Sequence, residues 1–162
     1  MCGARLESRR DRVAVTLAAV APDVDGIGLL WSEDLYVAWH HRLAHGALWA
    51  VLTAVTVALV SRNMRVTLLA VLAFHTHILA DLAGSGPGWP IFYTWPLTET
   101  QWLPDWQWDL ASWQNSTFGL ATVLVCLWCA LPLRRTPLEV LSVKADAAVV
   151  GALHQRFGRK PA

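Results

Sequence analysis

Three long apolar segments constrain the fold of this chain more than any other feature. They are residues 46–60 (GALWAVLTAVTVALV), 66–83 (VTLLAVLAFHTHILADLA) and 116–133 (STFGLATVLVCLWCALPL). A helix needs ~20 mostly apolar residues to cross a bilayer, and with DLYVAWHHRLAH before it the first segment would form one helix of about 25 residues. Buried helices of a soluble bundle are the alternative, but 162 residues leave little polar surface to cover three of them. We therefore predict an all-α integral membrane bundle of about four helices.

Composition agrees with a membrane protein. Hydrophobic residues make up 55% of the chain and the mean hydropathy is +0.39, which is high for a soluble domain. The formal net charge of +1 gives no basic footprint for nucleic acid, so the expected partner is the lipid bilayer. The three cysteines make no disulfide framework, and CLWC at 126–129 lies inside an apolar segment, where packing is the interpretation. The sequence does not indicate an oligomeric state.

The basic residues sort to one side of the membrane if the helices alternate in direction. Residues 12–21 predict a further short helix, which Pro22 ends. Twelve of the 13 lysines and arginines then precede that helix or open it, lie in the SRNMR connection at 61–65, or follow residue 133. The positive-inside rule makes this side cytoplasmic in an inner (plasma) membrane protein. We assign residues 1–135 to a membrane-embedded domain and 136–162 to a cytoplasmic tail that could form a surface helix.

Potential metal ligands gather on the side opposite to the arginines. His41 and His45 are four residues apart, and so are His77 and Asp81, so each pair would share one face of a helix. PDVD at 22–25 supplies two carboxylates on alternate residues, which an extended segment would point the same way. Imidazole and carboxylate ligands projecting from facing helices suit a divalent metal ion, with zinc preferred over manganese or iron. The predicted ligands are Asp23, Asp25, His41, His45, His77 and Asp81.

Other polar residues have simpler interpretations. His154 is expected to be a hydrogen-bonded structural residue, and His75 to be structural or to support a ligand. A purely structural polar cluster is the alternative for the six predicted ligands. Asn115 opens an NST glycosylation signal, but we expect either Asn115 or Ser116 to cap the last helix.

A tryptophan-rich loop follows the second apolar segment, residues 66–83. Residues 84–115 contain six of the ten tryptophans, and tryptophan concentrates at membrane interfaces. We expect this loop to lie at the interface and to roof the metal site. Glu99, Asp105 and Asp109 are candidates for a general base, with nothing to choose among them.

Three motifs and the segment that follows them resemble the LexA-regulated, inner-membrane, metal-dependent hydrolase family of bacteria. PDVD, HRLAH at 41–45 and HILAD at 77–81 correspond in order to the family's PDxD, HRxxTH and HxxxD motifs, and a Gly-rich turn with WPIFYTWPL follows. The resemblance covers residues 12–133. It implies metal-dependent hydrolysis, and it assigns functional roles to Asp23, Asp25, His41, Arg42, His45, His77 and Asp81.

The second motif departs from the family pattern in two ways. Ala44 stands where the family usually has threonine, and the family's two histidines are five residues apart rather than four. His40 is the residue five before His45, so either His40 or His41 could be the first ligand. We prefer His41 because Arg42 follows it. Arg42 is the only basic residue on the site side, and we expect it to bind an anionic group of the substrate or to orient Asp23 or Asp25.

These observations predict a membrane-bound metal-dependent hydrolase that uses a metal-activated water. A site at the interface favours a small or lipid-like substrate, and a phosphoester is the first choice because of a looser similarity to zinc-dependent phospholipases C. The alternative is a non-enzymatic membrane protein whose metal site is structural or handles ions. A structural site is closed and a catalytic site keeps an open position, and six ligands are compatible with both.

Overall fold

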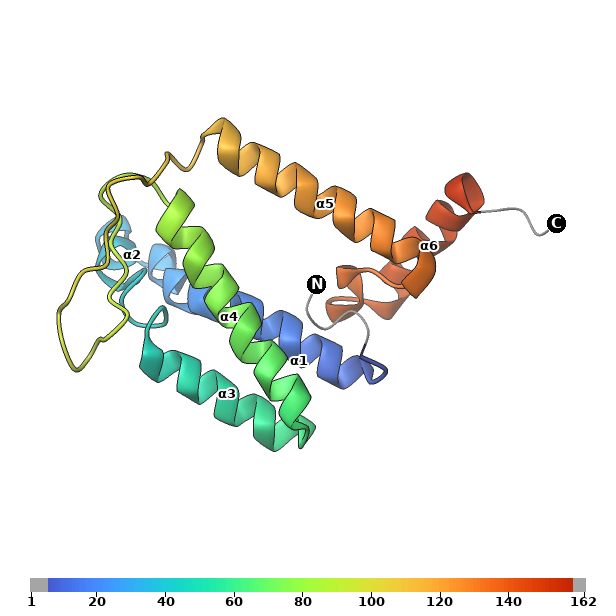
Figure 1. Cartoon of the computed structure of the whole chain (residues 1–162), viewed down its shortest axis with the longest axis horizontal. Coiled ribbons are helices and arrows are strands. Elements are labelled where there is room, and N and C mark those ends of the chain that lie inside the picture. The colour runs from blue at the N-terminus through green and yellow to red at the C-terminus, as the bar shows by residue number, and fades with distance from the viewer. Residues whose placement is uncertain (1–5, 159–162) are drawn as a thin grey trace.

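Helix α4 (Met64–Gly84) lies at the centre of the structure, a computed structural model that describes residues 6–158. Asn63 starts the helix by accepting a hydrogen bond from Arg65 N at 3.0 Å. Helices α1 (Arg9–Val20) and α3 (Ala47–Ser61) both pack on α4, and both contact it more extensively than they contact each other (Figure 1). Alanine side chains at these contacts let the backbones approach closely. The shared core consists of Val15, Ala18, Val57, Val66, Ala70 and Ala73.

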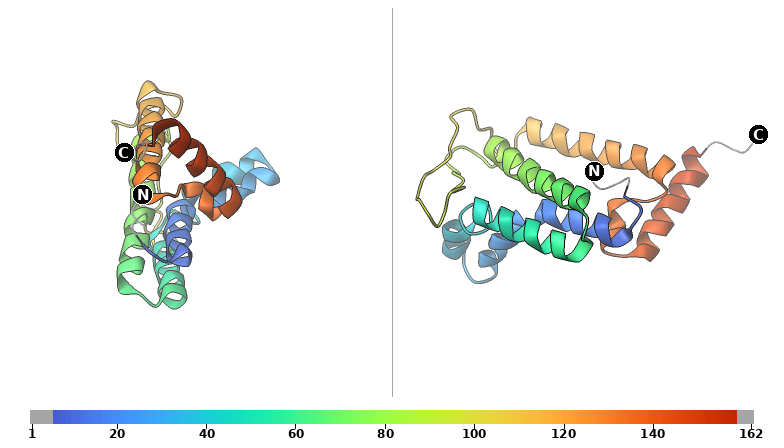
Figure 2. Two further views of the ribbon diagram at one scale, coloured as in Figure 1. Left: turned by 90° about the vertical axis from the view of Figure 1, so that its right-hand side faces the viewer. Right: turned by 60° about the horizontal axis from the view of Figure 1, so that its bottom comes forward.

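The remaining elements extend from this three-helix unit. They are the 3-10 helix η1 (Pro22–Leu30), α2 (Glu33–Trp39), α5 (Trp113–Leu133), the 3-10 helix η2 (Pro137–Val140) and α6 (Val143–Phe157). The described residues are thus helical with no strand, which confirms the predicted all-α class. Figure 2 shows α1, α3, α4 and α5 running lengthwise, with η1 and α2 projecting from one end.

Two helices, α4 and α5, are long and apolar enough to cross a membrane. Helix α1 with η1 makes a further candidate, bent by 62° between the two parts. Helix α3 has 15 residues and is therefore about 22 Å long, shorter than the ~30 Å hydrocarbon core. The predicted helix over 12–21 is confirmed, but it begins a turn earlier, where Ser8 caps it.

The prediction of one helix over residues 34–60 is wrong. Helix α2 ends at Trp39, α3 begins at Ala47, and residues 40–46 form turns between them. His41 adopts a left-handed backbone with φ of 65°, which no helix accommodates. The main-chain N–H of Ala44 bonds to the carboxylate of Asp25 instead of to a helical carbonyl.

Helix α5 contacts α6 but stands apart from α1, α3 and α4, and Asn115 fixes its start. The amide of Asn115 donates to Gly84 O at 2.7 Å, and its oxygen accepts from Trp108 Nε1 at 2.8 Å. The expectation that Asn115 or Ser116 caps this helix is wrong, because Ser112 is the N-cap and accepts from Asn115 N. Large apolar side chains are exposed around α5, where Ala130 is the only buried residue, as expected of a helix that contacts lipid.

The segment after residue 135 is tied to α1 by a buried ion pair. Arg12 donates from Nε and Nη2 to the two carboxylate oxygens of Glu139, at 2.6 and 2.7 Å. Asp146 of α6 accepts from the main-chain N and the hydroxyl of Thr136. Within the predicted tail, η2 therefore packs on α1, and α6 packs on η2 and α5.

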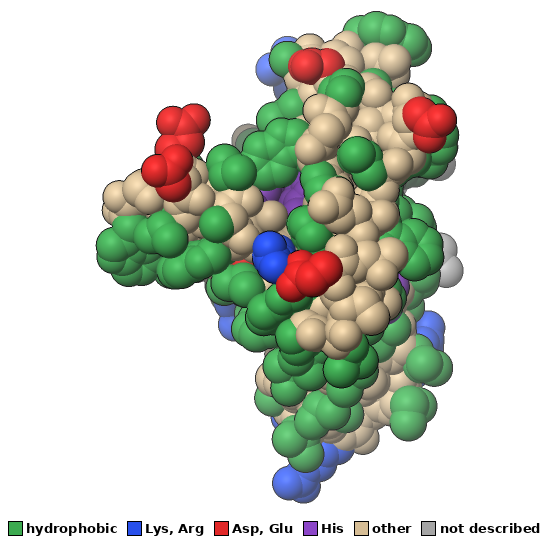
Figure 3. All heavy atoms as spheres, turned by 90° about the vertical axis from the view of Figure 1, so that its left-hand side faces the viewer, with side chains coloured by type: hydrophobic (Ala, Val, Ile, Leu, Met, Phe, Trp, Pro, Cys, Tyr) green, Lys and Arg blue, Asp and Glu red, His purple; other side chains and the backbone are tan. Residues whose placement is uncertain are grey.

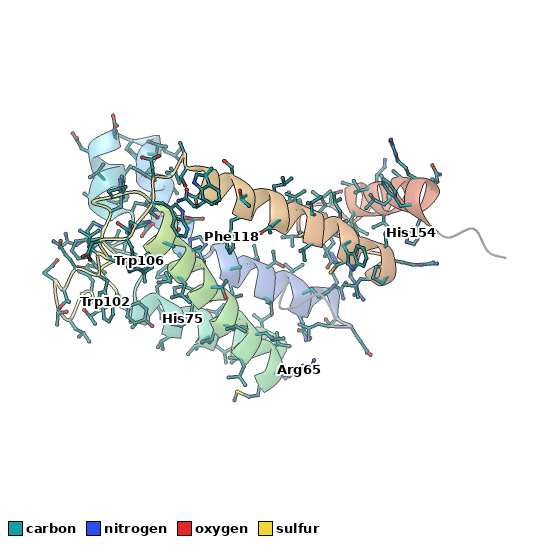
Figure 4. The ribbon with its side chains drawn as sticks, turned by 45° about the horizontal axis from the view of Figure 1, so that its top comes forward. Arg65, His75, Trp102, Trp106, Phe118 and His154 are labelled. Atoms are coloured by element: carbon teal, nitrogen blue, oxygen red, sulfur yellow. The ribbon has the colours of Figure 1, made fainter. Side chains whose placement is uncertain are left out.

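The arrangement of the helices places the arginines at one end of the bundle. Arg65, at the start of α4, lies at the end opposite to Trp102 and Trp106 of the long loop (Figure 4). Because α1 and α4 run in one direction and α3 and α5 in the other, the predicted sorting of basic residues agrees with the fold (Figure 1). Cys2, Arg5, Arg159 and Lys160 lie outside the described residues.

Candidate metal centre

Three separate elements bring four predicted ligands to one place. Asp23 comes from η1, His45 from the turn before α3, and His77 and Asp81 from successive turns of α4. His77 Nε2 lies 3.1 Å from Asp81 Oδ2 and 3.3 Å from Asp23 Oδ1. His45 Nε2 lies 3.2 Å from the same oxygen of Asp81. The four-residue spacing therefore places His77 and Asp81 on one face of α4, as predicted. His45, in contrast, lies in a turn and not in a helix.

These atoms approach one another without forming hydrogen bonds. His45 Nε2, His77 Nε2 and Asp81 Oδ2 are buried and have no hydrogen-bond partner within the described structure. Unsatisfied buried polar groups are costly, so such a group of them needs an explanation. Ligands at ~2.0–2.1 Å from one tetrahedral ion lie roughly 3.3 Å apart. The donor set, its spacing and its unsatisfied atoms all fit a divalent metal ion.

Asp25 lies beside this cluster but its oxygens are already engaged. Its Oδ1 contacts His40 Nδ1 at 2.9 Å. Its Oδ2 accepts from Ala44 N at 2.9 Å and contacts His45 Nδ1 at 3.1 Å. A proton on Nδ1 of His45 leaves Nε2 as the free nitrogen, which is the atom that faces Asp81. The structure thus places Asp25 on the Nδ1 side of His45 and not among the four converging side chains.

The 3-10 helix explains why the two aspartates separate. The expectation of an extended PDVD segment is wrong, because Pro22 opens η1 instead. A 3-10 helix has three residues per turn, so side chains two residues apart point in different directions. Asp23 faces His77, and Asp25 faces His40 and His45.

His41 is buried next to the cluster, but it lies in a turn and not in the predicted helix. It does not share a helical face with His45, since both lie in the turn between α2 and α3. Its ring centroid is 4.5 Å from that of His45, its Nε2 is 3.4 Å from Ser85 Oγ, and its Nδ1 has no partner. His40, His41 and His45 form a second group whose ligand atoms lie within 4.8 Å of one another. Both His40 and His41 are therefore close enough to His45 to support a metal ion.

The histidines of this turn experience opposite electrostatic environments. Burial, with the neighbouring His45 and His40, lowers the pKa of His41 to about 4, so this imidazole is neutral at pH 7. Burial alone would lower the pKa of His45 as well, but contacts with Asp25 and Asp81 outweigh it and raise that pKa. Asp25 and Asp81 thus favour a cation at His45 Nε2, where a bound metal ion would take the place of a proton, whereas burial favours a neutral ring at His41.

Arg42 is paired with the long loop. Its Nη2 donates to Glu99 Oε2 at 2.5 Å, and its guanidinium lies 5.0 Å from the centre of the Phe92 ring. The expectation that Arg42 orients Asp23 or Asp25 is therefore wrong. It remains the only basic side chain at this end among the described residues.

The long loop covers part of the cluster. Phe92 N donates to His41 O at 3.0 Å, and the ring of Trp89 packs 5.7 Å from that of His41. The sequence gave no reason to prefer one of the six tryptophans of the loop. In the structure, the ring of Trp89 packs near those of His40 and His41. Of the candidate bases, Glu99 pairs with Arg42 and Asp109 accepts from Ala111 N at 2.8 Å. Neither carboxylate therefore belongs to the cluster in this structure.

The cluster is closed on one side and open on the other. The side chain of His45 is fully buried, whereas 55% of Asp23 and 23% of Asp81 are exposed. Figure 3 shows histidine atoms at the base of a hollow in the face at this end of the molecule. A ligand at the cluster would thus be reached from the side of Asp23.

The two remaining histidines, His75 and His154, lie on α4 and α6 (Figure 4). His75 Nδ1 donates to Val71 O at 2.8 Å, so its Nε2 accepts from the hydroxyl of Tyr93, also at 2.8 Å. This residue is structural, one of the two alternatives that the sequence left open. His154 lies on α6 and its Nε2 has no hydrogen-bond partner, contrary to expectation.

Comparison with known proteins identifies the family. The sequence model of the YdjM inner membrane protein family matches residues 2–155, nearly the whole chain. The chain therefore belongs to this family and is a multi-pass protein of the bacterial inner membrane. No curated protein and no solved structure matches it.

Proposed function

We propose that this member of the YdjM inner membrane protein family is a metal-dependent hydrolase. One divalent ion, with zinc preferred, would be held by Asp23, His45, His77 and Asp81. The observation that carries the proposal is the set of unsatisfied buried atoms on His45, His77 and Asp81, in which the turn before α3 and helix α4 hold both histidine Nε2 atoms 3.1–3.2 Å from Asp81 Oδ2. Sites of two histidines and carboxylates are typical of zinc hydrolases.

The chain's own residues would prepare this site for reaction. A bound zinc ion lowers the pKa of a coordinated water towards neutrality and polarises a scissile bond. Asp25 holds His45 in the orientation that presents Nε2. Trp89 and the buried His41 limit the access of water from the loop side. Substrate would enter past Asp23, the exposed member of the cluster.

A lipid-like phosphoester is the substrate class that this setting favours. The cluster lies at the end of α4, which is long enough to span the bilayer, and next to a loop with exposed tryptophans. A headgroup at the interface would therefore be at the level of the metal ion. Arg42, at the same end, would exchange its exposed partner Glu99 for the phosphate of the substrate.

A structural or ion-handling metal site is the alternative function. Such a site would be coordinatively closed, whereas a hydrolase needs an open position. The exposure of Asp23 and Asp81 on one side of the cluster favours the hydrolase.

The test is metal content combined with hydrolysis. Purified wild-type protein should contain about one zinc per chain by elemental analysis and should hydrolyse bis(p-nitrophenyl) phosphate. His45→Ala and Asp81→Ala should insert normally but lose most of the metal and the activity, while the matched control His154→Ala retains both. A protein that binds metal but cleaves no phosphoester would favour the structural alternative. A protein that takes up neither zinc, manganese nor iron would refute the metal site itself.

A further inference from the structure

An apolar groove runs along the outside of the bundle between α1 and α3. It lies where both helices pack on α4 more extensively than on each other, and its volume is about 820 Å³. Ala18 and Val57 form its buried floor, and the small side chains of Ala14 and Thr53 leave its walls hollow. The metal cluster does not line this groove, so it requires an explanation of its own.

The two ends of the groove differ. At the end near η1 the groove is lined by Val24 and Trp49, and Trp49 Nε1 donates to Ala21 O at 3.1 Å, which joins α3 to the end of α1 and bounds the groove there. At the other end it reaches Arg9 and Arg10. The walled length is that of α1, whose 12 residues span about 18 Å. This is close to half of a ~30 Å hydrocarbon core, so the groove is as deep as one leaflet.

The arginine at the open end is available to a ligand. The side chain of Arg10 is 61% exposed, and its contacts are weak: Asp11 at 3.4 Å and Ser61 O at 3.5 Å. Arg9 is partly used, because it donates to Glu139 O at 2.6 Å. A guanidinium at the headgroup level of an apolar, leaflet-deep groove suits a molecule with an anionic head and an alkyl tail.

We propose that this groove is a binding site for one anionic phospholipid of the leaflet at the arginine end. The phosphate contacts Arg10, and an acyl chain lies between α1 and α3 with its end at Trp49. A helix of a second copy of the chain is a poorer fit, because a spanning helix needs a ~30 Å track and this groove closes after about 18 Å. The proposal depends on the membrane setting and not on the metal cluster.

The experiment is native mass spectrometry of the full chain in detergent, titrated with dioleoylphosphatidylglycerol or with the zwitterionic dioleoylphosphatidylcholine. The wild type should bind one phosphatidylglycerol in preference to phosphatidylcholine. Arg10→Gln should weaken phosphatidylglycerol binding about fivefold, the usual contribution of one arginine near an anionic membrane surface. Arg65→Gln, an arginine at the same end but outside the groove, should not.

Substitutions that fill the groove provide a second test of lipid binding. Thr53→Trp, and the milder Ala14→Leu, should reduce lipid binding, while Val123→Trp on the exposed face of α5 should leave it unchanged. Circular dichroism and elution volume verify that each variant folds. Equal binding of both lipids, or undiminished binding by the filled variants, would overturn the proposal. A dimer that Thr53→Trp dissociates would also overturn it and would assign the groove to a second copy.

Discussion

At the scale of single residues, Asp25 would support the proposed metal site without being one of its four converging side chains. Both of its oxygens are occupied, by His40, by His45 and by the main chain of Ala44. Its side chain is 1% exposed, so no water replaces these partners. One buried carboxylate therefore fixes both the backbone and the imidazole of the turn that carries His45.

Replacing Asp25 should weaken metal binding without abolishing it. Asn in its place still accepts from Ala44 N but holds the Nδ1 proton of His45 less strongly. We expect Asp25→Asn to lower zinc affinity about 10–100-fold, as is usual for the partner of a ligating histidine. Competition with a chromophoric chelator measures this, and Asp81→Asn, which alters a direct ligand, should lose far more. Equal losses in the two variants would mean that Asp25 itself binds the metal.

Arg42 is the second residue whose role a conservative change can test. Lysine keeps the charge but cannot bind a phosphate through two parallel N–H groups. If Arg42 binds the anionic group of the substrate, Arg42→Lys should lower kcat/KM about tenfold and leave zinc content unchanged. Steady-state kinetics with a phosphodiester decides this. Wild-type kinetics in the lysine variant would reduce Arg42 to an interfacial residue paired with Glu99.

At the scale of elements, the sequence predicted α4 well and the histidine turn poorly. No proline occurs in α4 and its only glycine is the last residue, so a four-residue spacing reliably set His77 beside Asp81. Residues 40–46 contain no proline, and the left-handed His41 depends on tertiary contacts that periodicity does not express. Gly46, which is the N-cap of α3, was the one local signal of a break, since glycine weakens a helix interior. The prediction that Asp23 and Asp25 point the same way was also wrong about local structure, because Pro22 opens a 3-10 helix in place of an extended segment.

The contribution of the contact between α1 and η2 to stability can be tested by substituting its ion pair. Arg12 and Glu139 are about nine-tenths buried and bonded through two N–H groups. Arg12→Met leaves Glu139 buried without its partner and should destabilise the protein by about 3–5 kcal/mol. The double variant Arg12→Met with Glu139→Leu should recover much of this loss, because two apolar groups replace the pair. Thermal unfolding in detergent measures both, and a double variant no more stable than the single one would contradict this account.

At the scale of the whole molecule, the fold separates most basic residues from the candidate metal ligands along its length. Apart from Arg42, the described arginines lie at or beyond the helix ends on the side where α4 starts, and the candidate metal ligands Asp23, His45, His77 and Asp81 lie towards the other end, which the long loop marks. Figure 4 shows Arg65 at the first end and Trp102 and Trp106 of that loop at the second. Charged groups of either kind avoid the apolar middle of the bundle, where they would be costly. The same alternation of helix directions thus produces the arginine end and the candidate metal centre, so the position of one fixes that of the other.

The orientation of the molecule in the inner membrane follows from this separation. The positive-inside rule places the arginine end in the cytoplasm and the metal cluster at the outer face. Met64 and Leu97 are suitable reporters, since they lie at opposite ends and are 72% and 90% exposed. In a background in which Cys2, Cys126 and Cys129 are serine, Leu97→Cys should react with a membrane-impermeant maleimide on spheroplasts, and Met64→Cys only after lysis. The reverse pattern would place the cluster in the cytoplasm, and its substrate would then have to come from the inner leaflet.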